Sequence, residues 1–409
     1  MGTEHPKLRP IEVLPVQRGK QSAIGLRDPQ QIAEQMVTVS TGAILILRCL
    51  DGEHSVLDIQ TEVARATGEI VPREHLERFI QQLDEALLLE SPRFAQFHAD
   101  LTRRFRESPV REPSHAGRSY PADPQEIAAL FDQHFQPPKG PGPDGRRSGP
   151  PPVAIMAPHI DLRIGGPGFA WAYGLVRDLP HVDTFLILGV AHAPTTHRFV
   201  GTRKSFRTPL GTAETDQAIL DALAQPLPFD LFEDELAHRL EHSVEFQVVY
   251  LQHVLGPQRP FKIVPILVGS FGAAIESGQE PIQDPEVAAF VQALQKLQWE
   301  SGSHTCVVAG VDLAHVGGRF GDEFTVNQEV LAQLERDDRQ TLEIARTGNA
   351  QRLFEQIHEE QDCRRVDGFA ALYTMLSALL IHGGEMLYYD QSVEPDTNSV
   401  VTYGSMCWW

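Results

Sequence analysis

Several features that would assign this 409-residue sequence to a class of protein are scarce or absent. Its four cysteines, Cys49, Cys306, Cys363 and Cys407, form no CxxC pair and no spacing typical of a disulfide framework. No apolar run approaches the roughly 18 residues of a membrane-spanning helix, and the first residues lack the apolar core of a signal peptide. We therefore expect a reduced, cytoplasmic protein without a membrane segment.

Basic residues are outnumbered, because 35 Lys and Arg stand against 55 Asp and Glu, giving a formal net charge of -20. Such a surface repels phosphate groups, so binding to nucleic acid or anionic membranes is not expected. The nucleotide-binding motifs GxGxxG, at dinucleotide spacing, and GxxxxGK[ST] are absent. Ser243, Ser270 and Cys306 do not stand in a nucleophile-elbow context, so a serine or cysteine hydrolase lacks support.

The N-terminal quarter of the chain predicts a flexible arm and a small helical domain. Residues 1–25 are polar and contain prolines, so we expect a loose arm there. Within residues 26–105, Ser55 and Asp58 have the spacing of a helix capping box, and Pro72 is typical of a first helical turn. Three short helices with a strand at each end would form a winged-helix-like domain.

Residues 106–409 alternate between apolar strand patterns and helical patterns, which predicts an α/β domain with a central sheet flanked by helices. A proline- and glycine-rich loop interrupts this domain at residues 137–152. The expected strands are residues 153–157, 184–189, 261–268, 305–311, 385–391 and 399–406. The expected helices are residues 124–134, 167–178, 214–224, 242–255, 285–298, 323–345, 349–358 and 367–381.

Histidines follow three of the expected strands. His159 and His192 each end an apolar run, and His315 follows another run together with Asp312. Ligands bind beyond the carboxyl ends of strands in open α/β sheets, so these side chains could share one polar site. A single histidine after a strand is more often a hydrogen-bonded turn residue. Its recurrence at several strand ends favours a metal site, because imidazole binds iron, zinc or copper.

Further ionisable residues stand at the starts of two expected helices. Glu241, His242 and Glu245 could contact substrate or the groups around a metal, or they could form a solvated acidic helix start. His242 and Glu245 also have the spacing of metal ligands on a helix, although one such pair is a weak signal. Asp367 could complete a metal site or simply cap its helix. Asp312 and His315 form a pair suited to acid and base catalysis, because the histidine pKa lies near neutrality.

The same residues carry a resemblance to the Memo family over about 300 residues, from near residue 108 to the C-terminus. The matching motifs are His115-Ala-Gly-Arg-Ser-Tyr-Pro121, Ala157-Pro-His159, Leu188-Gly-Val-Ala-His192, Thr208-Pro-Leu-Gly211, Glu241-His-Ser-Val-Glu245-Phe-Gln247 and Val311-Asp-Leu-Ala-His315. Bacterial and archaeal members are named AmmeMemoRadiSam system protein B. The resemblance implies the fold of the class III extradiol dioxygenases (LigB-like), whose sites hold nonhaem iron.

The Memo resemblance also implies roles for single residues. His159 and His192 become metal ligands, and His315 becomes an acid/base residue accompanied by Asp312. The third ligand position of the family is a cysteine before glycine, and here Asp367 stands at that place, with Cys363 as the alternative. Two histidines and a carboxylate suit ferrous iron, while copper or zinc would also bind such groups.

Residues 26–105 resemble the PqqD-like family, through the segments that begin at Val39 and Phe79. This resemblance implies a peptide or radical-enzyme partner, bound as an added strand, whereas the alternative is a domain that only packs or dimerises. Two functions follow for the whole chain. One is a nonhaem-iron-type redox or dioxygenase-like enzyme, and the other is a non-catalytic adaptor for a partner of a radical-enzyme system.

Overall fold

The computed structural model describes residues 4–18, 21–142, 150–177, 179, 181–301 and 304–409. The chain divides into two compact units. The smaller comprises Met1–Glu107, with which the short segment His192–Pro194 is grouped, and the larger comprises Ser108–Ala191 and Thr195–Trp409. Residues 143–149 of the expected proline- and glycine-rich loop lie outside the described residues.

The smaller unit begins with a three-stranded antiparallel sheet of strands β1 (Glu12–Arg18), β2 (Gln21–Arg27) and β3 (Val37–Ser40), in the order β1-β2-β3. The expectation of a loose arm over residues 1–25 is therefore wrong for β1 and most of β2. These strands pair over their whole length, and Leu26 of β2 is fully buried. The buried ion pair between Arg9 and Asp28 fixes the chain on either side of the hairpin.

Four helices follow this sheet: α1 (Ile44–Arg48), α2 (Val56–Thr67), α3 (Arg73–Glu85) and α4 (Pro92–Glu107). The predicted capping box is present, since Ser55 and Asp58 exchange hydrogen bonds at the start of α2. The arrangement differs from the winged-helix expectation. The strands of this sheet all precede α1, and within the described residues a further helix, α4, takes the place of the strand expected after α3.

The larger unit is built on an eleven-stranded mixed sheet with the order β12-β14-β5-β11-β6-β10-β9-β8-β4, in which β13 pairs with β14 and β7 with β10. Its strands are β4 (Val110–Arg111), β5 (Ala154–Ala157), β6 (Thr184–Val190), β7 (Phe199–Gly201), β8 (Ser205–Thr208), β9 (Gly211–Thr215), β10 (Lys262–Val268), β11 (Thr305–Gly310), β12 (Asp312–Gly317), β13 (Gly384–Glu394) and β14 (Ser399–Trp408). The central strands β5, β11, β6 and β10 run parallel, whereas β14 is antiparallel to β5.

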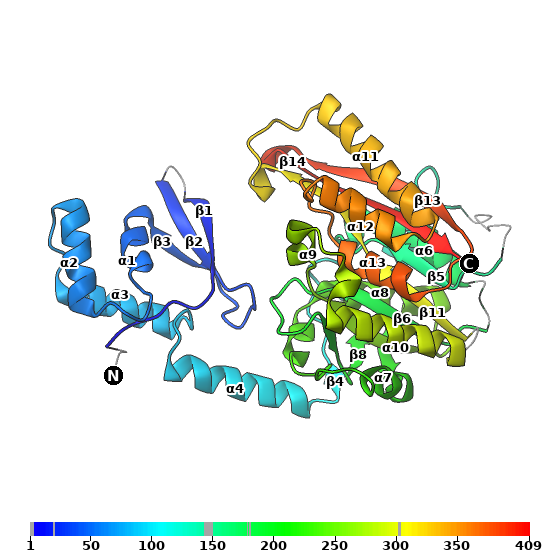
Figure 1. Ribbon diagram of the computed structural model, residues 1–409, viewed down its shortest axis with the longest axis horizontal. Coiled ribbons are helices and arrows are strands. Elements are labelled where there is room, and N and C mark those ends of the chain that lie inside the picture. Colours follow the sequence, from blue (N-terminus) through cyan, green and yellow to red (C-terminus); the bar gives the residue numbers. More distant parts are fainter. Residues whose placement is uncertain (1–3, 19–20, 143–149, 178, 180, 302–303) are drawn as a thin grey trace. The chain divides into compact units, whose positions relative to one another are not determined.

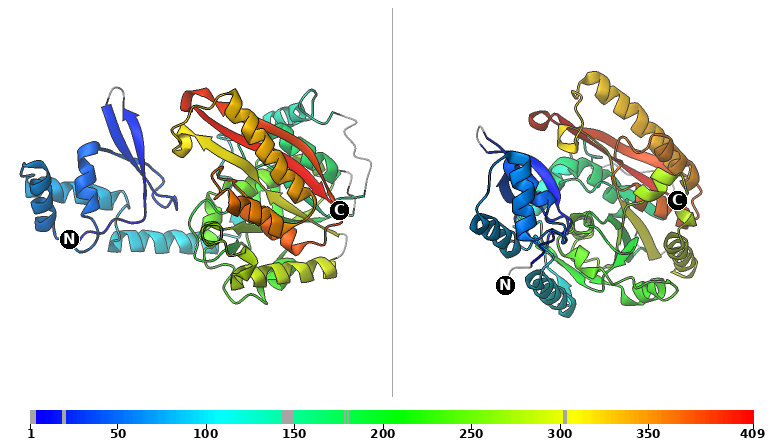
Figure 2. Two further views of the ribbon diagram at one scale, coloured as in Figure 1. Left: turned by 45° about the horizontal axis from the view of Figure 1, so that its top comes forward. Right: turned by 60° about the vertical axis from the view of Figure 1, so that its left-hand side comes forward.

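Helices lie on both sides of this sheet (Figures 1 and 2). They are α5 (Pro124–His134), α6 (Leu162–Arg177), α7 (Gln217–Ala224), α8 (His242–Leu255), α9 (Gly272–Ser277), α10 (Pro285–Ser301), α11 (Gln328–Arg346), α12 (Ala350–Glu359) and α13 (Phe369–Ala378). Side chains of the strands alternate between two cores. Met156 and Leu188 pack with α10 and α13, while Ile155 and Ile187 pack with α5, α6 and α8.

The flanked central sheet agrees with the α/β expectation, and α5 and α8 have the predicted bounds. Strand β12 was not expected, because Asp312 and His315 interrupt its apolar pattern. In the described part of the chain, no helix combines the length and the apolar character that crossing a membrane requires.

Candidate metal centre

His159 and His192 reach the same edge of the sheet because their strands run in the same direction. Strands β5 and β6 both pair in parallel with β11, which lies between them. The carboxyl ends of the two strands are therefore side by side. His159 follows the last residue of β5 by two positions, and His192 follows the last residue of β6 by two.

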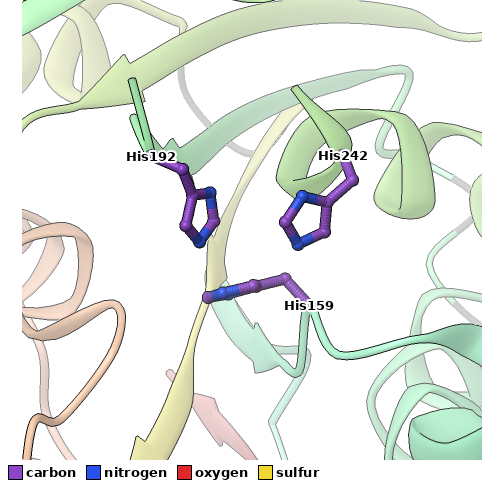
Figure 3. A group of neighbouring side chains, drawn as sticks. All are labelled: His159, His192 and His242. Carbon is purple, nitrogen blue, oxygen red and sulfur yellow. The ribbon is translucent and has the colours of Figure 1, made fainter. Parts of the chain in front are cut away.

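A third histidine, His242, completes a group at this edge. One ring nitrogen from each of His159, His192 and His242 lies within 4.8 Å of the others. The three rings converge on one space, from a loop, from a strand end and from the start of a helix (Figure 3). His159 is buried, His242 is half-buried and His192 is exposed, so the group is closed on one side and open to solvent on the other.

The start of α8 brings His242 to this group. Glu241 caps the helix, because its Oε1 accepts hydrogen bonds from the backbone N–H groups of His242 (2.8 Å) and Ser243 (2.9 Å). Ser243 Oγ donates to the Val190 carbonyl and accepts from the Val190 N–H, both at 3.0 Å. A Cβ on Gly189 would lie 2.6 Å from Ser243 Oγ, so only glycine lets α8 come this close to β6.

The next turn of α8 holds the segment that carries His159. Gln247 is fully buried, and its Nε2 donates to the Pro158 carbonyl at 2.9 Å. Its Oε1 in turn accepts a hydrogen bond from the Tyr173 hydroxyl at 2.7 Å. One helix therefore positions two of the three histidines.

Two carboxylates contact His159. Asp312 is buried, and its Oδ1 accepts a hydrogen bond from the His159 backbone N–H at 3.0 Å. Its Oδ2 lies 3.7 Å from His159 Nε2. Asp367 is closer to the ring, with Oδ2 3.0 Å from the same Nε2. Asp367 reaches this position because Gly368 adopts φ +97° and lies against Val311, whose Cα would be 2.7 Å from an added Cβ.

His315 lies on β12, three residues after Asp312. Its Nδ1 lies 3.1 Å from the Leu313 carbonyl, an acceptor, so Nδ1 is the nitrogen that donates in this contact. Strict alternation would place Asp312 and His315 on opposite faces of the strand. The pairing of β12 with β14 is irregular between these residues, which removes that restriction.

Glu245 faces the interior rather than the histidines. It is fully buried, and its carboxylate pairs with Arg111 and accepts hydrogen bonds from Tyr120 Oη (2.6 Å) and the N–H groups of Ser114 (3.0 Å) and His115 (3.1 Å). Burial raises the pKa of this carboxyl, but the Arg111 charge and the hydrogen bonds outweigh it and leave the pKa below its ordinary value. Glu245 thus holds the 114–120 segment in place.

His115 is a neighbour of the site that sequence reasoning quoted only as part of a motif. Its ring centroid lies 5.5 Å from that of His242, and its Nε2 donates to the Leu240 carbonyl at 3.0 Å. In the sequence, His115 is marked only by its place in a motif of the Memo resemblance. The fold then brings it beside His242.

Comparison with known proteins gives a match to the family model described as Memo-like protein over residues 111–407. The chain belongs to the Memo family. Its relatives include a MEMO1 family protein of Aquifex aeolicus, 27% identical over 384 residues, which cover 93% of this chain and 94% of the relative. A MEMO1 family protein of Thermus thermophilus is 27% identical over 350 residues, 85% of this chain and 97% of the relative. One of Methanopyrus kandleri is 28% identical over 307 residues, 72% of this chain and 98% of the relative.

The Memo match contains all the residues of the centre. His159 and His192, the two histidines expected to bind metal, both lie in the three-histidine group. His242 lies in it as well, although it was expected to contact substrate or the groups around a metal. Asp367 contacts His159. Exposed Cys363, the alternative to Asp367, is not part of the histidine group among the described residues.

Proposed function

We propose that this Memo family protein is a nonhaem metal protein, in which His159, His192 and His242 hold a divalent ion and Asp367 supplies a carboxylate ligand beside them. The observation that carries the proposal is the convergence of three histidine nitrogens within 4.8 Å at the carboxyl edge of the sheet. Metal-bound histidine nitrogens lie about 2 Å from an ion. A small inward movement of these side chains would therefore bring all three within reach.

The contact between Asp367 and His159 supports the carboxylate ligand. Asp367 Oδ2 is 3.0 Å from His159 Nε2. Two ligand atoms at neighbouring positions of an ion, each bonded at about 2.1 Å, lie about 3 Å apart. The pair thus has the separation of two ligands of one ion, while without an ion the same separation is that of an ordinary hydrogen bond donated by Nε2–H.

The donor set suits a borderline divalent metal. Neutral imidazoles bind iron, zinc and copper, and an additional carboxylate with open positions is typical of ferrous sites. We propose iron first, with zinc and copper as competitors. A bound ferrous ion would supply Lewis acidity and one-electron redox chemistry, so the proposed activity is a redox or dioxygenase-like reaction.

The surrounding residues would hold and move protons. Because His315 Nδ1 donates to the Leu313 carbonyl, the neutral ring would present Nε2 as an acceptor, as a general base requires. Asp312 holds the His159 backbone through Oδ1 and lies beside the ring through Oδ2, so it would fix the orientation of this ligand.

Metal analysis of the purified chain tests the proposal. We expect about one equivalent of metal after anaerobic loading with Fe²⁺, Zn²⁺ or Cu²⁺, and loss of tight binding in His159→Ala, His192→Ala and His242→Ala. Asp367→Asn should weaken metal binding about tenfold or more, because replacing even a residue that only supports a metal ligand commonly lowers metal affinity by about that factor. The exposed His304, in the larger unit, provides a control as His304→Ala. Wild-type metal content in the ligand variants, or none in the wild type, would make the assignment wrong.

A second function is an adaptor that binds a peptide or partner of a radical-enzyme system through residues 26–105, as the PqqD-like resemblance implies. It is supported by the open sheet of the smaller unit, in which β3 is an edge strand. The Aquifex aeolicus relative also covers 93% of this chain, and so extends into this unit. Titration of labelled protein with candidate peptides should shift the amide signals of β3. Unchanged spectra at high peptide concentration would count against the adaptor.

A further inference from the structure

Residues 361–368, which join α12 to α13 and carry Asp367, follow an unusual backbone path. Gln361, Asp362 and Arg365 have φ of 50°, 46° and 52°, and Gly368 has φ of 97°. Residues other than glycine rarely adopt these left-handed backbone conformations, because they cost free energy. They persist only where surrounding contacts impose them. The contacts that impose this path therefore determine where Asp367 lies.

Two backbone hydrogen bonds attach the segment to β12. The His315 N–H donates to the Arg364 carbonyl at 2.7 Å, and the Asp367 N–H donates to the Leu313 carbonyl at 3.1 Å. Asp367 and His315 are thus positioned by the same pairing. A movement of residue 364 would displace both residues.

The Arg364 side chain anchors this pairing in the protein interior. It forms a buried ion pair with Asp338 of α11, and its remaining donors bind Glu360 Oε2 and Thr341 Oγ1, both at 2.9 Å. The guanidinium is planar and offers donors in fixed directions, so these partners determine its position. Lysine would keep the charge but could not reproduce the arrangement.

Asp338 connects the same anchor to β12 by a second route. Its Oδ2 accepts hydrogen bonds from Thr402 Oγ1 (2.6 Å) and Tyr389 Oη (2.9 Å). Thr402 Oγ1 also accepts from the Ala314 N–H at 2.8 Å, at the irregular part of β12 between Asp312 and His315. The network therefore holds residue 364 on one side and the β12 irregularity on the other.

We propose that the Arg364–Asp338 ion pair is the positioning pair of the metal centre: it holds Asp367 at His159 and keeps the β12 backbone of Asp312 and His315 in register. This inference rests on the proposed metal function and names residues that act through the ligands rather than on the ion. The positioning itself is a property of the protein without metal, so the two ideas can fail separately.

The test compares Arg364→Met and Arg364→Lys with Arg9→Met in the full chain. Arg9 is a matched control, because it is also a buried arginine paired with a buried aspartate, in the smaller unit. Co²⁺ affinity and the Co²⁺ absorption spectrum are measured at a temperature at which each variant is folded. We expect Arg364→Met to weaken Co²⁺ binding at least tenfold and to alter the Co²⁺ spectrum. Arg364→Lys should give values between those of Arg364→Met and wild type. Arg9→Met should change neither the affinity nor the spectrum.

A second measurement does not depend on metal. Imidazole ¹⁵N signals of His159 in the metal-free protein report its hydrogen bond to Asp367. In Arg364→Met these signals should move in the direction that Asp367→Asn produces, while Arg9→Met leaves them unchanged. If wild type binds neither Co²⁺ nor Fe²⁺, Zn²⁺ or Cu²⁺, the proposed function is wrong and these signals alone decide the positioning role.

Unchanged His159 signals in folded Arg364→Met would overturn the proposal. Should Arg364→Met fail to fold, Thr402→Val takes its place, because it removes the link between Asp338 and Ala314 while keeping the ion pair. It should give a smaller movement of the His159 signals in the same direction, and the absence of any movement would equally overturn the proposal.

Discussion

Ser243 and Val190 exchange two hydrogen bonds, which fasten the first turn of α8 to the end of β6. Both bonds, from Ser243 Oγ to the Val190 carbonyl and from the Val190 N–H to Ser243 Oγ, measure 3.0 Å. This contact joins two segments about fifty residues apart in sequence, and it places His242 beside His192. The three-histidine group therefore depends on the distance between a helix start and a strand.

That distance can be changed at Gly189. In Gly189→Ala the new methyl group would lie 2.6 Å from Ser243 Oγ and 2.8 Å from Val244 Cγ2, so α8 must move away. We expect a loss of about 1–3 kcal/mol in the free energy of unfolding, together with weaker metal binding. Urea unfolding and metal titration measure the two effects. Gly174→Ala is the control, since its Cβ would make only ordinary contact at 3.6 Å with Phe135. Equal metal affinity in both variants would contradict the role of this contact.

Gly368 offers a second test of the same site. Gly368→Ala combines a left-handed backbone with a Cβ 2.7 Å from Val311 Cα, so we expect Asp367 to be displaced and metal affinity to fall. The left-handed conformation alone costs about 1–2 kcal/mol in a non-glycine residue. Gly68→Ala, with φ +76° and open space around its Cβ, introduces that cost in the smaller unit without a clash. If Gly368→Ala and Gly68→Ala lose similar stability and both keep wild-type metal affinity, Gly368 does not position Asp367 for metal binding.

Glu245 should make the protein sensitive to acid. Its pKa is lowered in the folded state from an ordinary 4.5, so it contributes stability above pH 4.5 that is lost as the pH falls through the folded pKa. Glu245→Gln leaves the buried Arg111 without its charged partner, and breaking such a pair costs about 3–5 kcal/mol at neutral pH. The difference between wild type and variant should shrink in urea-unfolding measurements as the pH falls below 4.5 and Glu245 becomes protonated. A difference that is constant with pH would show that the charge of Glu245 is not the cause.

His238 should act over a higher pH range. Burial lowers its pKa from 6.5 to about 4, so between these values the unfolded chain takes up a proton that the folded chain does not. Stability contributed by the neutral ring is therefore complete above pH 6.5 and falls by about 3 kcal/mol as the pH drops towards 4. His238→Gln keeps a donor for the Val200 carbonyl without a titrating group. Its stability should vary less over this range, although His134, whose pKa burial also lowers to about 4, still contributes. Identical pH slopes for wild type and variant would refute the assignment.

The central sheet and two of its histidines were predictable because the causes are local in sequence. An apolar run that ends in His159 or His192 identifies a buried strand and the polar residue after it, and parallel strands bring such ends together. The position of His242 was not predictable, because it depends on Gly189 and Ser243 making contact. Strand β12 was missed because Asp312 and His315 break its apolar pattern. The β1–β2 hairpin was missed because polar residues such as Gln21 and the proline Pro15 obscure the alternation of a strand.

Strand β14 lies in the interior of the sheet, between β5 and β12, although it consists of residues 399–408. A ribosome makes these residues more than two hundred positions after His159. Until they are made, β5 lacks the neighbour that β14 provides. Strand β12, which carries Asp312, then has no strand that connects it to β5. The pairing that joins the strand of Asp312 to the strand that leads to His159 consequently forms only after residues 399–408 have been made.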